Sequence, residues 1–152
     1  MKTRIFSAFV NNNSGVLTRI SGLFARRGYN IKSLTVGETP DPRVSRMTIE
    51  CLGDDRTFEQ IESQLRKVED VISVAMLDPE RTVWRELFLI GVRGASAPSE
   101  NVCGLDYRIV SQSDSGAVYE LCGTGDDLKR FCALFGGAEF DIARTGITAV
   151  EK

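Results

Sequence analysis

Histidine is absent from the 152 residues of this chain. Histidine is the commonest general base and the commonest metal ligand in proteins, so its absence removes every nucleophile–histidine pair and many metal sites. The four cysteines form no Cys-x-x-Cys pair, which argues against a zinc knuckle and against a thioredoxin-like redox site. The sequence therefore predicts neither catalytic residues nor metal ligands.

Long apolar runs and a strong net charge are missing as well. No stretch approaches the ~20 apolar residues of a membrane span, and no charged segment followed by an apolar block resembles a signal peptide. The 19 Lys and Arg residues against 21 Asp and Glu residues give a net charge of −2, which provides no electrostatic basis for binding nucleic acid. We expect a cytoplasmic protein with reduced thiols that binds neither membranes nor nucleic acid.

The first half of the chain has the pattern of a complete small domain. Strands are predicted over residues 4–10, 30–38, 45–51 and 71–77, and helices over 16–27 and 57–68. This β-α-β-β-α-β order is the ferredoxin-like arrangement, in which both helices pack on one face of a four-stranded antiparallel sheet. Strict alternation over residues 45–51 places Arg46, Thr48 and Glu50 on the opposite face, which we expect to be wet.

The second half repeats this pattern in a weaker form, after a polar, proline-marked segment at residues 78–81. Strands are predicted over residues 84–92, 107–111 and 117–122, with a last strand within 142–150. A helix over 128–135 follows a cap at Asp126 or Asp127, but Gly94–Ser99 reads as a loop where the first helix should be. The predicted fold class is α+β, with two ferredoxin-like βαββαβ domains in tandem: residues 1–78, and a smaller domain of residues 79–152 with a shortened first helix.

The strongest candidate site is the junction between the first strand and the first helix. Free N–H groups at a helix start favour an anion, and Gly15 has no Cβ to keep a ligand carboxylate away from the backbone. The alternative is that Asn13 or Ser14 caps the helix and Gly15 only eases the turn. Asn30, after the helix, offers an amide either to a ligand or to its own turn.

Three stretches of the sequence resemble a known family. They are NNNSGVLTRISGLFARRGYNIKSLTVGETPDPRVSRMTIECLGDDR, the later IARTGI, and the WREL at Trp84–Leu87, and they resemble the ACT-domain small, regulatory subunits of acetolactate synthase. The resemblance implies that residues 1–78 form an effector-binding ACT domain and residues 79–152 the C-terminal domain of the small subunit. It also implies a chain without an active site, which docks on the large catalytic subunit, raises its activity and confers feedback inhibition by a branched-chain amino acid, usually valine.

The same resemblance implies where cofactors and effector lie. Thiamine diphosphate, magnesium and FAD are expected on the large subunit only, with no cofactor in this chain. The effector is expected between the ACT domains of a homodimer. Carried over position by position, the effector-binding residues are Asn12, Ser14, Gly15, Val16 and Leu17 from one protomer, with Asn30 and Ile31 from its partner. Backbone N–H groups of residues 15–17 would hold the carboxylate, oxygens near Asn12 and Asn30 would take the ammonium group, and Ile31 would border an apolar pocket.

Two alternatives stay open at this point. The chain is either this subunit or a free-standing ACT-type amino-acid sensor that regulates another enzyme or a transcription factor. The proline-stiffened hairpin at residues 39–46 either touches the large subunit or is an ordinary solvated loop.

Overall fold

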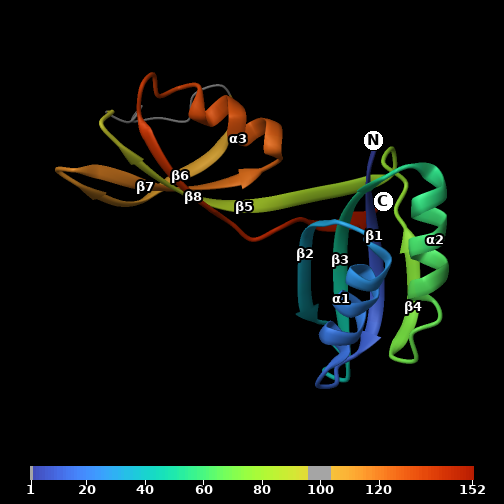
Figure 1. Ribbon diagram of the computed structural model, residues 1–152. Coiled ribbons are helices and arrows are strands. Elements are labelled where there is room, and N and C mark those ends of the chain that lie inside the picture. The colour runs from blue at the N-terminus through green and yellow to red at the C-terminus, as the bar shows by residue number, and fades with distance from the viewer. Residues whose placement is uncertain (1, 96–103) are drawn as a thin grey trace. The chain divides into compact units, whose positions relative to one another are not determined.

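The computed structural model describes residues 2–95 and 104–152 (Figure 1). The chain divides into two compact units. One contains the chain up to Val83 together with Ile147–Lys152, and the other is Trp84–Gly146. The first unit therefore extends beyond the predicted boundary at residue 78 and takes in the last six residues as well.

The first unit has the predicted ferredoxin-like order of elements. They are β1 (Lys2–Asn11), α1 (Val16–Arg27), β2 (Ile31–Glu38), β3 (Val44–Gly53), α2 (Asp55–Leu65) and β4 (Val71–Met76). The strands form an antiparallel sheet in the order β2-β3-β1-β4. As predicted, α1 ends at Arg27, and Gly28 follows as its C-cap with a φ of 68°, in the left-handed region that glycine adopts without strain.

The core of this unit lies between the sheet and the two helices (Figure 1). Alternate residues of each strand face the helices, as a side-chain period of two requires, while the helices contribute residues spaced three and four apart. The fully buried side chains include Phe6, Ala8, Met47, Ile49, Cys51, Ile20, Phe24, Phe58, Ile61 and Leu65.

The opposite face of this sheet is not wet, contrary to the sequence-based expectation. Thr48 is only 3% exposed and Glu50 only 7%. The last residues of the chain return to cover this face. The amide of Ile147 donates to Ser33 Oγ over 3.0 Å, and Arg46 Nη2 donates to the carbonyl of Ala149 over 2.8 Å.

The second unit repeats the same strand order in a sheet of four strands. Its elements are β5 (Thr82–Arg93), β6 (Asp106–Ser113), β7 (Gly116–Gly123), α3 (Gly125–Cys132) and β8 (Glu139–Arg144), in the order β6-β7-β5-β8. One of these strands, β5, also pairs with β9 (Thr148–Glu151) as a fifth strand. The core between α3 and the sheet is built around four aromatic rings, those of Tyr107, Tyr119, Phe131 and Phe135, in which Tyr119 and Phe131 each contact the other three. The predicted shortened first helix falls on residues 96–103, outside the described residues.

The predicted last strand is in fact two strands, β8 and β9 (Thr148–Glu151), with Gly146 between them at a φ of 86°. The side chain of Glu86, fully buried, holds the bend: its carboxylate accepts from Arg144 at 2.5 and 2.6 Å and from the Gly146 amide at 3.1 Å. After this bend β9 pairs with β5, and the amide of Lys152 donates to the carbonyl of Arg81 over 2.8 Å.

Candidate functional site

The junction after β1 is fixed to the hairpin that joins β2 and β3. The amide of Asn12 donates to the carbonyl of Arg43 over 2.7 Å. Its side-chain Nδ2 donates to the carbonyl of Pro42 over 2.9 Å and to Glu38 Oε1 over 3.0 Å. Both Nδ2 hydrogens are thereby engaged, and Oδ1 is left as an acceptor without a donor among the described residues.

The start of α1 carries no side-chain cap. Gly15 itself occupies the N-cap position at a φ of 86°, and within the described chain neither Asn13 nor Ser14 caps the helix, so the capping alternative is wrong. The amide of Val16 makes only a long 3.4 Å hydrogen bond to the carbonyl of Asn13. The first-turn N–H groups therefore remain available, next to the positive end of the helix dipole.

An arginine that sequence analysis did not single out lies beside this turn. A Cβ placed on Gly15 would come within 3.3 Å of Arg19 Nη1. Arg19 is held there by Asp70, whose Oδ2 accepts from Nε and Nη2, each at 2.6 Å. The spacing of four residues, one helical turn from Gly15, was the available signal. The guanidinium adds positive charge where the free amides already favour an anion.

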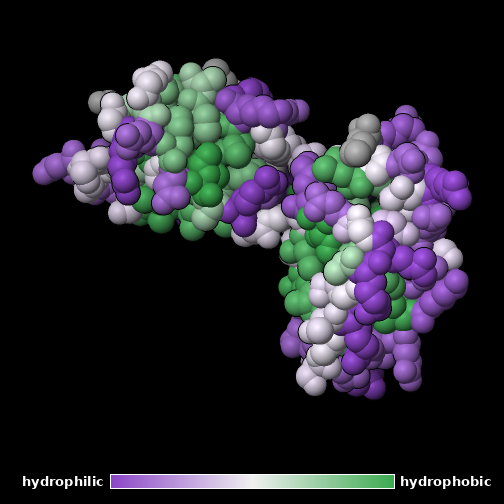
Figure 2. Space-filling model, in the orientation of Figure 1, coloured by the Kyte–Doolittle hydropathy of each residue, from purple (hydrophilic) through white to green (hydrophobic). Residues whose placement is uncertain are grey.

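The side chains of Val16 and Leu17 differ in their surroundings. Val16 is buried in the core beneath α1, so only its backbone can face a ligand. Leu17, in contrast, is 47% exposed, and Ser14 is exposed as well. Hydrophobic residues, green in Figure 2, also reach the surface of this unit. Leu17 therefore supplies apolar contact area next to the turn.

Asn30 and Ile31 do not meet the turn within one chain. Ile31 pairs with Cys51 of β3, whereas Asn11, next to the turn, pairs with Val44. The run of β3 from Val44 to Cys51 spans about 23 Å at the usual rise of a strand. The seven predicted effector residues thus form two groups at opposite ends of the sheet.

The edge of the sheet connects these two groups. β2 is the edge strand, and Val36 on it is 44% exposed. The far end of β2 carries Glu38, which is hydrogen-bonded to Asn12 of the turn. An edge strand has unpaired backbone groups that can pair with another strand. One group of predicted residues therefore lies at the beginning of this edge, and the other lies next to its end.

Two aspartates, Asp54 and Asp127, take part in the hydrogen bonds at helix starts. Asp54 is the N-cap of α2 and accepts from the amide of Thr57, and hydrogen bonding to the side chain and amide of Thr57 lowers the pKa of Asp54. At α3 the predicted cap is wrong: Thr124 is the N-cap, and Asp127 accepts from the Thr124 amide and hydroxyl in a capping box. The same hydrogen bonds lower the pKa of Asp127.

The described part of the chain has neither a metal-binding cluster nor a membrane-spanning helix. It contains no group of three or more His, Cys, Asp or Glu side chains placed to hold a metal ion. Within the same residues, no helix has the length and apolar character needed to cross a membrane.

Known proteins resemble this chain over nearly its whole length. Residues 6–73 match the family model of the AHAS small subunit-like ACT domain. The chain is 43% identical to a Methanothermobacter thermautotrophicus protein described as "Probable acetolactate synthase small subunit", over 99% of this chain and 93% of that protein. It is 37% identical to "Acetolactate synthase isozyme 3 small subunit" of Salmonella typhimurium, over 98% and 95%. The crystal structure of the acetolactate synthase small subunit from Thermotoga maritima matches with a TM-score of 0.84 at 36% identity, over 100% and 98%.

Proposed function

The chain belongs to the family of acetolactate synthase small subunits, and from this premise we propose that it is a non-catalytic regulatory subunit that binds valine or a related branched-chain amino acid. It docks on the large catalytic subunit in the cytoplasm, raises the activity of that subunit and makes it sensitive to feedback inhibition. The observation that carries the proposal is the uncapped first turn of α1 at Gly15.

The carboxylate of the amino acid binds at this first turn. The backbone N–H groups of residues 15–17 point along the helix axis toward the ligand, and Gly15 leaves them open to it. Arg19, held beside Gly15 by Asp70, adds a fixed positive charge. Because the helix N-terminus and the guanidinium act on the same ligand group, the site favours an anion over a neutral analogue.

The ammonium group binds to oxygen atoms at the edge of the same turn. Asn12 is oriented by the two hydrogen bonds that its Nδ2 donates, which leaves its Oδ1 as an acceptor. Asn30 of a second copy supplies a further amide oxygen. Both charged groups of an α-amino acid are therefore bound without a ligand that titrates near neutral pH, which suits a chain that has no histidine.

A homodimer completes the site. In a two-fold dimer with the β2 edges antiparallel, the beginning of β2 in one copy lies against the end of β2 in the other. Asn30 and Ile31 of the second copy then come beside the turn, because Glu38 at the end of β2 contacts Asn12. Ile31 and the exposed Leu17 would border the aliphatic side chain of the effector.

Regulation follows from the placement of the site between two copies. A ligand favours one arrangement of the dimer over another only by its differential affinity for the two, typically worth ~1–3 kcal/mol. The hydrogen bonds from Asn12 to residues 38, 42 and 43 tie the turn to the hairpin at residues 39–46. That hairpin is our candidate for passing the change to the large subunit.

The test is Gly15→Asp in the complex reconstituted with the large subunit. The substitution places bulk and negative charge where the carboxylate binds, so valine inhibition should be lost while activation of the large subunit persists. Gly137→Asp is the matched control, because Gly137 also has a positive φ, of 75°, and open space around it, but lies in the second unit. Unchanged valine inhibition in Gly15→Asp contradicts the site. Failure to co-purify with the large subunit favours the free-standing sensor instead.

A further inference from the structure

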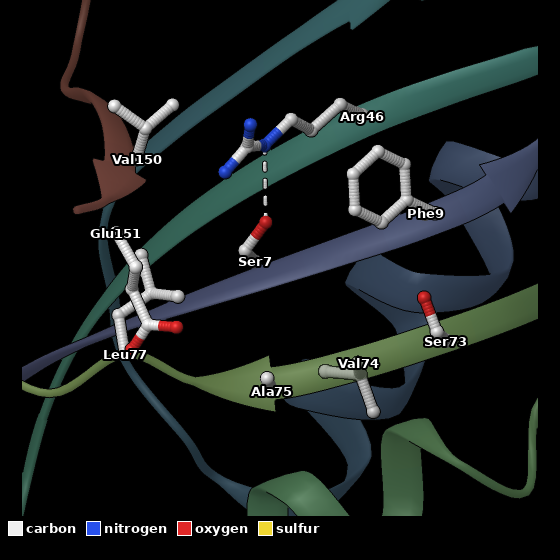
Figure 3. Close-up of a pocket in the computed structure, with 9 residues that line it drawn as sticks. All are labelled: Ser7, Phe9, Arg46, Ser73, Val74, Ala75, Leu77, Val150 and Glu151. Atoms are coloured by element: carbon white, nitrogen blue, oxygen red, sulfur yellow. Dashed lines mark hydrogen bonds between the residues drawn. The ribbon is translucent and has the colours of Figure 1, made fainter. Parts of the chain in front are cut away.

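A pocket of about 350 Å³ lies on the face of the first sheet that is turned away from α1 and α2 (Figure 3). Strands β1, β3 and β4 form its floor, and β9 forms one wall. None of the predicted effector residues lines it. Its volume is at the low end of the range of about 300–1,000 Å³ that is typical of ligand pockets, which suits a small ligand.

Arg46 lies on one side of the pocket, and its hydrogen bonds go to neutral groups. Arg46 Nε donates to Ser7 Oγ over 3.1 Å, and Nη2 donates to the carbonyl of Ala149 over 2.8 Å. The guanidinium carbon lies 5.4 Å from the centre of the Phe9 ring. In the described part of the chain no carboxylate forms an ion pair with Arg46, although the residue is half-buried. A half-buried guanidinium bound only to neutral groups retains its capacity for a ligand carboxylate.

The other side of the pocket carries an anion. Glu151 and Leu77 lie across from Arg46 and Phe9 (Figure 3). The Glu151 carboxylate accepts one hydrogen bond, from the amide of Asp78 over 3.1 Å, and no cationic side chain pairs with it among the described residues. The pocket therefore offers a positive and a negative group, together with apolar surface from Phe9, Leu77 and Val150.

We propose that this pocket binds a free α-amino acid with an aliphatic side chain. The Arg46 guanidinium holds the carboxylate, the Glu151 carboxylate holds the ammonium group, and Phe9 and Leu77 cover the side chain. A ligand with only one of these charges leaves the opposite group of the pocket uncompensated. Because Arg46 is also bonded to Ala149, occupation of the pocket stabilises the seated position of β9. The proposal concerns a second site and does not depend on the effector site at Gly15.

The test is a nuclear magnetic resonance titration of the ¹⁵N-labelled full chain with L-leucine, 4-methyl-2-oxopentanoate and 3-methylbutylamine. The second compound lacks the ammonium group and the third lacks the carboxylate. Leucine should shift the amide resonances of Ala75 and Val150, which line the pocket, and each analogue should bind there at least ~10-fold more weakly. Equal binding of either analogue would overturn the zwitterion assignment.

The resonances of Gly15 and Leu17 report separately on the effector site in the same titration. Shifts there without shifts at Ala75 and Val150, up to about 10 mM leucine, overturn the second site and leave the proposed function standing. Shifts at Ala75 and Val150 alone support the pocket and count against the effector site.

Two substitutions approach the pocket from different strands. Arg46→Met removes the charge and keeps most of the side-chain length, and Ala75→Phe fills the pocket from β4 without removing any hydrogen bond of Arg46. Each should weaken leucine binding at the pocket at least ~10-fold. Arg26→Met, in the exposed last turn of α1, is the control and should change nothing. Wild-type affinity in Ala75→Phe overturns the proposal, even if Arg46→Met does not fold.

Discussion

At the scale of single residues, the ion pair between Arg19 and Asp70 positions the positive charge beside Gly15. The Asp70 side chain is 12% exposed and that of Arg19 52%, so loss of the arginine leaves a largely buried carboxylate without its partner. A buried carboxylate without a partner destabilises the fold by more than the ion pair stabilises it, because burial has already removed the hydration of the carboxylate.

We expect Arg19→Met to lower the free energy of unfolding by about 1–3 kcal/mol. Asp70→Asn combined with Arg19→Met should cost less than the sum of the two single changes, measured as a double-mutant cycle in urea. Arg66→Met is the control, since Arg66 pairs with Glu62 on the exposed surface of the chain and should cost below about 0.5 kcal/mol. Strict additivity of the two changes would contradict the coupling.

Two cysteines have opposite surroundings, which predicts different reactivity. Burial, with a smaller contribution from Glu50, raises the pKa of Cys51 to about 12, whereas Cys122 is exposed. The thiolate is the reactive form, so Cys51 should react with iodoacetamide at pH 8 at least ~1,000-fold more slowly than Cys122. Peptide mass spectrometry after timed labelling measures both rates, and unfolding in urea should abolish the difference. Rapid labelling of Cys51 in the folded chain would show that its strand opens.

At the scale of elements, the capping box of α3 makes the stability of the second unit depend on pH. Hydrogen bonds from the Thr124 amide and hydroxyl lower the pKa of Asp127 in the folded state below its value in the unfolded chain, about 3.9. Asp127 therefore contributes its full stabilisation of the folded state above about pH 5. This contribution is lost as the pH falls through the pKa of Asp127 in the folded state.

Asp127→Asn should consequently be less stable than the wild type at pH 6, and the difference should shrink toward pH 3. Denaturation followed by the fluorescence of Trp84, the only tryptophan, measures it in the unit that contains α3. Asp126→Asn serves as the control, because Asp126 is exposed and only pairs with Lys129. A difference between Asp127→Asn and the wild type that is constant from pH 6 to pH 3 would contradict the assigned pKa shift.

The starts of α1 and α3 show why sequence patterns predicted the positions of the helices better than the residues that cap them. Both helices of the first unit follow from the spacing of apolar residues, but several polar residues precede each helix start. At α1 the run of Asn and Ser suggested a side-chain cap, whereas the structure uses Gly15. At α3 two aspartates suggested a cap, whereas the hydroxyl of Thr124 takes that place. Which polar residue becomes the cap depends on backbone angles that local composition does not determine.

At the scale of the whole molecule, the last residues of the chain are a structural part of the first unit. Ile147 is 2% exposed, and its amide is bonded to Ser33 on the sheet face. Ile147→Ala should therefore lower the free energy of unfolding by about 2–5 kcal/mol, as for other buried aliphatic truncations. Thr148→Ala, at the exposed neighbouring position, should change it by less than about 0.5 kcal/mol. Urea denaturation compares the two, and equal stabilities would contradict the packing role of Ile147.

The sequence predicted the two ferredoxin-like sheets but not this return of the chain. Alternation over β3 assigned Arg46, Thr48 and Glu50 to an outer face correctly, yet it could not indicate that residues 147–149 cover that face. The pocket beneath β9 was missed for the same reason, since it depends on a contact between residues 103 positions apart. In the candidate site, the turn at Gly15 was nominated from local pattern and resemblance. The spacing of Arg19 from Gly15 was a local signal, but the position of its guanidinium depends on Asp70, far along the chain.

The position of β9 also determines where the chain can be cut to separate its two units. The chain leaves the first unit at Val83 and re-enters it at Ile147. The second unit is therefore an insertion within the first unit and not a C-terminal extension of it. A truncation that aims to isolate the first unit by stopping after β4 therefore discards a strand that belongs to that unit. Excision of residues 84–146 with a short linker in their place keeps β9 joined to that unit, and the same two junctions are the natural crossover points for building chimaeras with relatives.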